Sequence, residues 1–262
     1  MAKKKKLALV DVDGTLVNTN ISFILVEELN RKGLFSKDEL NLVEKARKDY
    51  KDGKISYNKL VEEYDIHFAK GLKGKKRDDV EKVAKDVAKD SFAKHGYKNV
   101  SEGMHYLNRR GITPVLLSGG PGVLMRSLAK EVGKGTHIEG YGPEVEIGKD
   151  GAYTGELEKF EIKTIKGVDL YTAEHMLGTR QPQIFNRTGK YLFAKNVIEP
   201  KLGGEVVLGM GDSEGDLWML LKDADAHKTV RTPVLITKEP ELKKHAKKHG
   251  IKTFHWHEET HK

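Results

Sequence analysis

The sequence of 262 residues contains no cysteine, so disulfide bonds and thiol chemistry are excluded. It also lacks any apolar run close to the roughly 20 residues that a membrane helix needs. The basic start, MAKKKKL, is like the front of a signal peptide, but the apolar run behind it is short and is interrupted by Asp11 and Asp13. We therefore expect a cytoplasmic protein that is neither exported nor bound to a membrane.

Positive charge is in modest excess, with a net charge of +8. Half of this excess comes from one short stretch, Lys3 to Lys6. Elsewhere lysines are interleaved with acids, as in RDDVEKVAKDVAKD, which is typical of a solvated helix face. We expect no nucleic-acid partner, and instead a cationic surface that attracts small anions.

The chain alternates between strand and helix patterns, apart from one long helical stretch. Residues 7 to 12, 113 to 120 and 205 to 212 are apolar runs typical of buried parallel strands. PEVEIGKDGAYTGEL has the pattern of a hairpin, and AHKTV that of a short edge strand. Residues 18 to 99 have helical periodicity with about four segments. The sequence predicts an α/β protein with a doubly wound parallel sheet, formed by 1–17 and 100–262, and a helical domain, 18–99, inserted after the first strand.

Polar residues follow three of the predicted strands, where the ligands of open α/β sheets bind. Asp11 and Asp13 follow the first strand, Ser118 and Gly119 the second, and GDSEGD, with Asp212 and Asp216, the third. A hydroxyl and free N–H groups before a helix can cradle a phosphate, and carboxylates can hold its metal. Each signal alone also fits an ordinary turn or helix cap.

A lysine completes the series, because RTGKYLF places Lys190 after a glycine at the start of a predicted helix. Along the chain, the order is therefore Asp-x-Asp, Ser, Lys, Asp-x-x-x-Asp, and each of these groups suits a phosphate or its metal. Together these residues indicate a phosphate site rather than a set of unrelated turns.

These four motifs resemble those of the haloacid dehalogenase-like (HAD) superfamily of hydrolases. DVDGTLV is similar to its first motif, LLSGG to its second, Lys190 to its third and GMGDSEGD to its fourth. The 22 residues from Lys190 to Asp212 resemble the phosphoserine phosphatase-like branch, as does the helical insertion. The resemblance implies a Rossmann-like core, a helical cap and a Mg²⁺-dependent phosphatase that forms an aspartyl-phosphate.

The resemblance also implies a role for each motif residue. Asp11 would be the nucleophile, Asp13 the general acid and base, and Lys190 a catalytic cation. Ser118, Gly119 and Lys190 would bind the phosphate. The metal would be held by Asp11, the backbone carbonyl of Asp13 and Asp212, with Asp216 close by or acting through water.

The substrate is expected to be a small phosphorylated metabolite. The cap stretch DGKISYNKLVEEY resembles that of phosphoserine phosphatase, but Asn20 and Glu62 stand where the resemblance implies a carboxylate and an arginine. Missing charge partners disfavour phosphoserine. A phosphotransferase or phosphomutase on the same scaffold, and a non-catalytic phosphate-binding protein, are the alternatives. The sequence leaves open the oligomeric state and whether residues 158–187 form extra lid or an oligomer contact.

Overall fold

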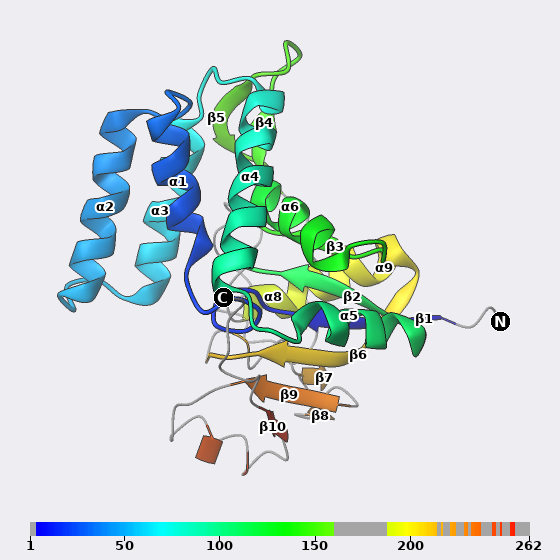
Figure 1. Cartoon of the computed structure of the whole chain (residues 1–262). Coiled ribbons are helices and arrows are strands. Elements are labelled where there is room, and N and C mark those ends of the chain that lie inside the picture. The colour runs from blue at the N-terminus through cyan, green and yellow to red at the C-terminus, as the bar shows by residue number, and fades with distance from the viewer. Residues whose placement is uncertain are drawn as a thin grey trace.

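The computed structural model describes residues 4–159, 188–213, 216, 221–223, 228–229, 232–236, 243–244, 247 and 252–254. At its centre lies a six-stranded sheet in the order β10-β9-β6-β1-β2-β3, in which every pair of neighbours is parallel (Figure 1). The strands are β1 (Lys5–Val10), β2 (Ile112–Leu117), β3 (Glu139–Tyr141), β6 (Gly204–Gly211), β9 (Thr232–Ile236) and β10 (Lys252–Phe254).

Both faces of this sheet are covered by helices. Successive side chains of a strand point to opposite sides, so neighbouring residues of β1 pack against different helices. Leu7 and Leu9 of β1 pack with α8 (Thr188–Phe193), the π-helical segment η2 (Ala194–Ile198) and the neighbouring α9 (Glu199–Leu202). Ala8 and Val10 belong to the apolar cluster of the other face, with α5 (Val100–Arg109) and α6 (Gly122–Gly133). The predicted doubly wound α/β fold is therefore confirmed.

Four helices lie between β1 and α5, as the periodicity of residues 18 to 99 predicts. They are α1 (Ile21–Arg31), α2 (Lys37–Lys51), α3 (Tyr57–Gly71) and α4 (Arg77–His95). Three of them have an N-cap residue whose side chain accepts a hydrogen bond from a backbone N–H group. These N-cap residues are Asn20, Ser36 and Ser56. The apolar cluster on the α6 face of the sheet continues into these helices.

The predicted hairpin is formed by β4 (Val145–Ile147) and β5 (Tyr153–Leu157), which pair antiparallel. It is joined to the segment between α3 and α4, since Gly74 N donates to Tyr153 O at 2.8 Å and Tyr153 N to Lys75 O at 2.9 Å. The hairpin therefore links the helical region to the chain that follows the sheet strand β3.

Some details differ from the sequence prediction. β1 ends at Val10 and β2 at Leu117, so Asp11 and Ser118 directly follow their strands. Within AHKTV, strand β8 (Lys228–Thr229) pairs with β7 (Leu221–Asp223) in a separate antiparallel ribbon, so it is not an edge of the main sheet. Choice of pairing partner is a long-range property that a short pattern does not encode. Among the described residues, no helix has the length and apolar character needed to cross a membrane.

Candidate active site

Three neighbouring strands, β6, β1 and β2, place polar residues at the carboxyl ends of the strands. This side of the sheet is called the sheet edge below. Val10 at the end of β1 lies opposite Leu116 of β2 and Met210 of β6, and Asp11 N donates to Met210 O at 2.9 Å. Because these strands are parallel, the residues that follow them share this edge. Asp11, Ser118 and Asp212 therefore come from one end of the sheet, as the motif order predicts.

Lys190 of α8 lies between two of the predicted carboxylates. Its Nζ is 2.6 Å from Asp11 Oδ1 and 2.6 Å from Asp216 Oδ1. All three side chains are buried. Burial alone would lower the pKa of Lys190, but the two carboxylates together raise it above its ordinary value. The lysine is therefore a fixed positive charge that joins its own helix to two other segments, those of Asp11 and Asp216.

Asp11, Asp212 and Asp216 each offer a carboxylate oxygen within 4.8 Å of the others. Burial and the charge of Asp216 raise the pKa of Asp11 to about 6, although Lys190 opposes this rise. Burial and repulsion by Asp11 and Asp216 raise the pKa of Asp212 to about 8. A hard divalent cation prefers such oxygen ligands and would relieve their repulsion, so this donor set fits Mg²⁺.

Asp216 also organises the loop after β6. Its Oδ2 accepts hydrogen bonds from Ser213 Oγ at 2.9 Å and from the backbone N–H groups of Asp212 and Ser213, each at 3.2 Å. With Oδ1 on Lys190, both oxygens of Asp216 are bound by the protein. Its geometry is that of a residue that positions Lys190 and the loop of Asp212.

Two further residues contact the carboxylates but were not singled out in the sequence. Thr15 is fully buried, and its Oγ1 donates to Asp11 Oδ2 at 3.3 Å and lies 3.5 Å from Asp212 Oδ1. Ser213 is the second, through its contact with Asp216. The only signal for either is its position inside DVDGT or GDSEGD, within two residues of a predicted acid.

Asp13 is not a member of the group of three clustered carboxylates. Its Oδ1 accepts a hydrogen bond from Ile21 N, the first residue of α1, at 3.2 Å. Burial and the charge of Asp11 raise the pKa of Asp13 to about 7. The carboxyl group of Asp13 is therefore held near Asp11 by the start of the helical region.

Ser118 is buried at the end of β2, before α6. Its Oγ accepts from Gly120 N at 3.1 Å, and its own N–H donates to Tyr141 O at 3.2 Å. Gly119 lies between the two residues of this short loop, which leads through Pro121 into α6. The predicted phosphate loop thus occupies the strand end adjacent to Asp11.

The turn after β1 depends on Gly14. Its φ is +81°, a left-handed conformation that favours glycine. A Cβ on this residue would also overlap with the carboxylate of Asp212. Glycine is therefore favoured at this position for two reasons, the left-handed turn and the close approach of Asp212.

The two residues on which the expectation against phosphoserine rests, Asn20 and Glu62, both have local partners. Asn20 is the N-cap of α1, and its Oδ1 accepts from Ser22 N at 3.1 Å. Glu62 Oε2 lies 3.1 Å from Lys59 Nζ on the surface of α3. Most of the segment 158–187, whose role the sequence leaves open, lies outside the described residues.

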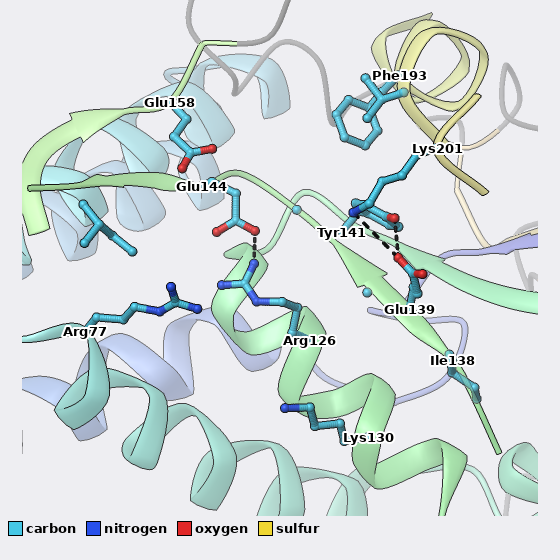
Figure 2. A pocket seen from close by; sticks show the side chains of 14 residues that line it. Arg77, Arg126, Lys130, Ile138, Glu139, Tyr141, Glu144, Glu158, Phe193 and Lys201 are labelled. Carbon is cyan, nitrogen blue, oxygen red and sulfur yellow. Dashed lines mark hydrogen bonds and ion pairs between the residues drawn. The ribbon is translucent and has the colours of Figure 1, made fainter. Parts of the chain in front are cut away.

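A separate hollow of about 640 Å³ lies beside β3, α6 and α9. Figure 2 shows Arg126 facing Glu144, and Lys201 reaching toward Tyr141 and Glu139. None of the predicted site residues lines it. Two of the cations in its lining, Arg126 and Lys201, pair with acids of the same lining. The hollow is therefore distinct from the group of residues at the sheet edge.

The haloacid dehalogenase-like hydrolase family matches residues 8–185, which is more than half of the chain. The chain belongs to this family of hydrolases, and the predicted superfamily is confirmed. No curated protein matches the sequence.

Solved structures show the same fold. A protein with unknown function from Bordetella pertussis Tohama I has a TM-score of 0.67 at 17% identity, and the match covers 96% of this chain and 99% of that one. A phospho-aspartyl intermediate analogue of phosphoserine phosphatase has a TM-score of 0.52 at 21% identity, covering 92% and 91%. Cytosolic 5'-nucleotidase IIIB bound to cytidine has a TM-score of 0.58 at 13% identity, covering 98% and 81%.

Proposed function

We propose that this hydrolase cleaves a small phosphate monoester through an aspartyl-phosphate on Asp11. The observation that carries the proposal is the contact of Lys190 with Asp11 and Asp216, with Asp212 completing the carboxylate group. A phosphate dianion repels a carboxylate nucleophile, so positive charge and positioning dominate phosphoryl transfer. Lys190 supplies that charge and fixes one oxygen of Asp11.

In the first step, an oxygen of Asp11 attacks phosphorus as the bond to the leaving oxygen breaks. Asp13 donates a proton to that leaving oxygen. In the second step, Asp13 takes a proton from water, whose oxygen attacks the phosphorus and releases Asp11 and inorganic phosphate. Ser118 and Gly119, at the adjacent strand end, bind the non-bridging oxygens throughout.

Asp11, Asp212 and the backbone carbonyl of Asp13 would hold Mg²⁺, with Asp216 behind them on Lys190. When bound, the ion would neutralise charge on the phosphoryl oxygens and so favour the approach of Asp11. Without it, Lys190 is the one cation that the structure places in contact with Asp11 among the described residues.

We further propose that residues 18–99 form a cap that selects the leaving group. Asn20 uses its oxygen as a helix cap, and Glu62 faces Lys59, so neither offers the charge that would match an amino-acid leaving group. A small phosphorylated metabolite other than phosphoserine is therefore the proposed substrate class, in a cytoplasmic setting.

The proposal is tested with an artificial aryl phosphate. The purified protein is expected to release phosphate in the presence of Mg²⁺ and to stop when EDTA is added. Asp11→Asn is expected to abolish turnover and keep the thermal midpoint and circular dichroism spectrum of the wild type. Asp86→Asn, an exposed acid of α4, is the matched control and should keep full activity.

Normal turnover by Asp11→Asn would contradict the assigned nucleophile. Transfer of the phosphoryl group to a sugar hydroxyl faster than to water would instead identify a phosphotransferase on this scaffold. A panel of phosphorylated metabolites then identifies the substrate.

A further inference from the structure

The start of α1 buries a hydroxyl group that has no partner. Ser22 is 4% exposed, and its Oγ makes no hydrogen bond with the residues that the structure describes. The backbone of Ser22 is fixed on both sides, because its N–H donates to Asn20 Oδ1 and its carbonyl accepts from Tyr64 OH at 2.8 Å. A buried hydroxyl left unpaired costs about 1–3 kcal/mol, so its presence needs a reason.

Ser22 lies against the loop that is proposed to bind phosphate. A Cβ placed on Gly120 would be 2.5 Å from Ser22 Oγ and 3.6 Å from Ser118 Oγ. Both hydroxyls therefore lie on the same side of Gly120, one from the start of α1 and one from the end of β2. A glycine at this position leaves the space between the two serines free of a side chain.

The surroundings of Ser22 favour an anionic oxygen as its missing partner. The preceding N–H group, of Ile21, already donates to the carboxylate of Asp13. The N-terminal end of an 11-residue helix carries a partial positive charge that favours anions. Ser22 thus combines a free donor, a helix terminus and contact with the phosphate loop.

We propose that Ser22 donates its hydroxyl hydrogen to an oxygen of the bound phosphoryl group, as a second serine opposite Ser118. This inference rests on the proposed phosphatase function and adds a phosphate-binding residue from the helical region. A phosphate in the site would pair the buried hydroxyl and would join α1 to the loop after β2.

The test compares Ser22→Ala with the wild type in the full-length protein with Mg²⁺, using inorganic phosphate as the probe. The dissociation constant for phosphate, from calorimetry and competitive inhibition of aryl phosphate hydrolysis, is expected to rise roughly tenfold, as for loss of a hydrogen bond to a charged group. The thermal midpoint without phosphate should be equal to or above that of the wild type, because alanine removes an unpaired hydroxyl.

Two further variants make the result specific. Ser22→Cys keeps the side-chain size but provides only a weak donor, so it should bind phosphate with intermediate affinity. Ser127→Ala is the matched control, because the Ser127 hydroxyl already donates to Val123 O at 2.9 Å within α6. This control should leave phosphate binding unchanged.

Unchanged phosphate affinity in Ser22→Ala, with a raised midpoint, would overturn the inference and leave Ser22 as a packing residue. A raised KM for the ester without weaker binding of inorganic phosphate would also overturn it, because the hydroxyl would then serve the leaving group. Wild-type protein that neither binds phosphate nor hydrolyses the ester would overturn the proposed function itself.

Discussion

The sheet edge and the helical region both bury polar side chains, and they differ in how these are paired. At the edge, Lys190 lies 2.6 Å from each of two buried carboxylates, those of Asp11 and Asp216. In the helical region, Asp65 of α3 is 1% exposed, and neither of its oxygens has a hydrogen-bond partner among the described residues. Ser22 of α1 is similarly unpaired.

This difference shows that a buried polar group affects the stability of the fold in two ways, depending on whether it has a partner. A buried charge with a well-placed opposite charge is tolerated, and removal of one partner is what destabilises the fold. A buried group without a partner lowers stability from the outset. The edge therefore depends on all of its members, whereas the helical region holds groups whose removal should stabilise the protein.

The largest effect is expected for Lys190→Met. It leaves Asp11 and Asp216 buried without their cation, and it should lower the free energy of unfolding by about 3–5 kcal/mol and abolish phosphatase activity. Chemical denaturation at neutral pH measures the first effect. Lys201→Met, at an exposed pair of 3.9 Å, is the control and should cost less than about 1 kcal/mol.

A double variant sharpens this result. Lys190→Met combined with Asp216→Asn removes one of the two uncompensated charges and should recover part of the lost stability, but no activity. If Lys190→Met alone is as stable as the wild type, the buried charges at the sheet edge are not coupled in the way described.

Gly14→Ala is expected to have the next largest effect. The new Cβ is strained at a φ of +81° and overlaps with Asp212, so unfolding should become easier by about 2–4 kcal/mol, with at least a hundredfold loss of activity. Gly53→Ala is the matched control, with a φ of +72° and nothing within 4 Å of the added Cβ. Equal losses in both variants would show that strain alone, and not the approach of Asp212, decides the result.

The smallest effect, and of opposite sign, is expected for Asp65→Asn. Burial raises the pKa of Asp65 well above its ordinary value, so between the unfolded and folded pKa the native state binds more protons than the unfolded state. Asp65 should therefore contribute a fall in wild-type stability as pH rises above about 4, and the variant should lack this contribution.

The gain in Asp65→Asn should be about 1–3 kcal/mol at pH 7 and should vanish at pH 3, where the carboxyl group is neutral in both states. Thermal melts across this pH range measure it. Asp86→Asn, exposed on α4, should show no such pH-dependent gain. Lower stability of Asp65→Asn at pH 7 would mean that Asp65 has a partner after all.

The fold class and the strand-end residues follow from local patterns in the sequence. The apolar runs before Asp11, Ser118 and Asp212 predict parallel strands, and parallel strands bring their ends to one edge. The contacts made there are not local. That Lys190 bridges Asp11 and Asp216 depends on packing of α8 against β1, which no sequence spacing specifies.

Other features escape a sequence pattern for the same reason. Thr15 and Ser213 are ordinary turn residues until folding places a carboxylate beside each. Nothing in the sequence of α1 or α3 marks Ser22 or Asp65 as unpaired, because whether a polar group finds a partner depends on which elements cover it. The pairing of AHKTV outside the main sheet is likewise decided by its neighbours in space.

The bond between Lys190 and Asp11 joins residues 179 positions apart. A ribosome therefore releases the aspartate long before it adds the ammonium group that complements it, and domains fold in step with synthesis. A nascent chain that has reached only the helical region lacks both Lys190 and the acids after β6. The contacts of Lys190 with Asp11 and Asp216 are thus made late in translation, and partly made chains lack the buried cation beside Asp11.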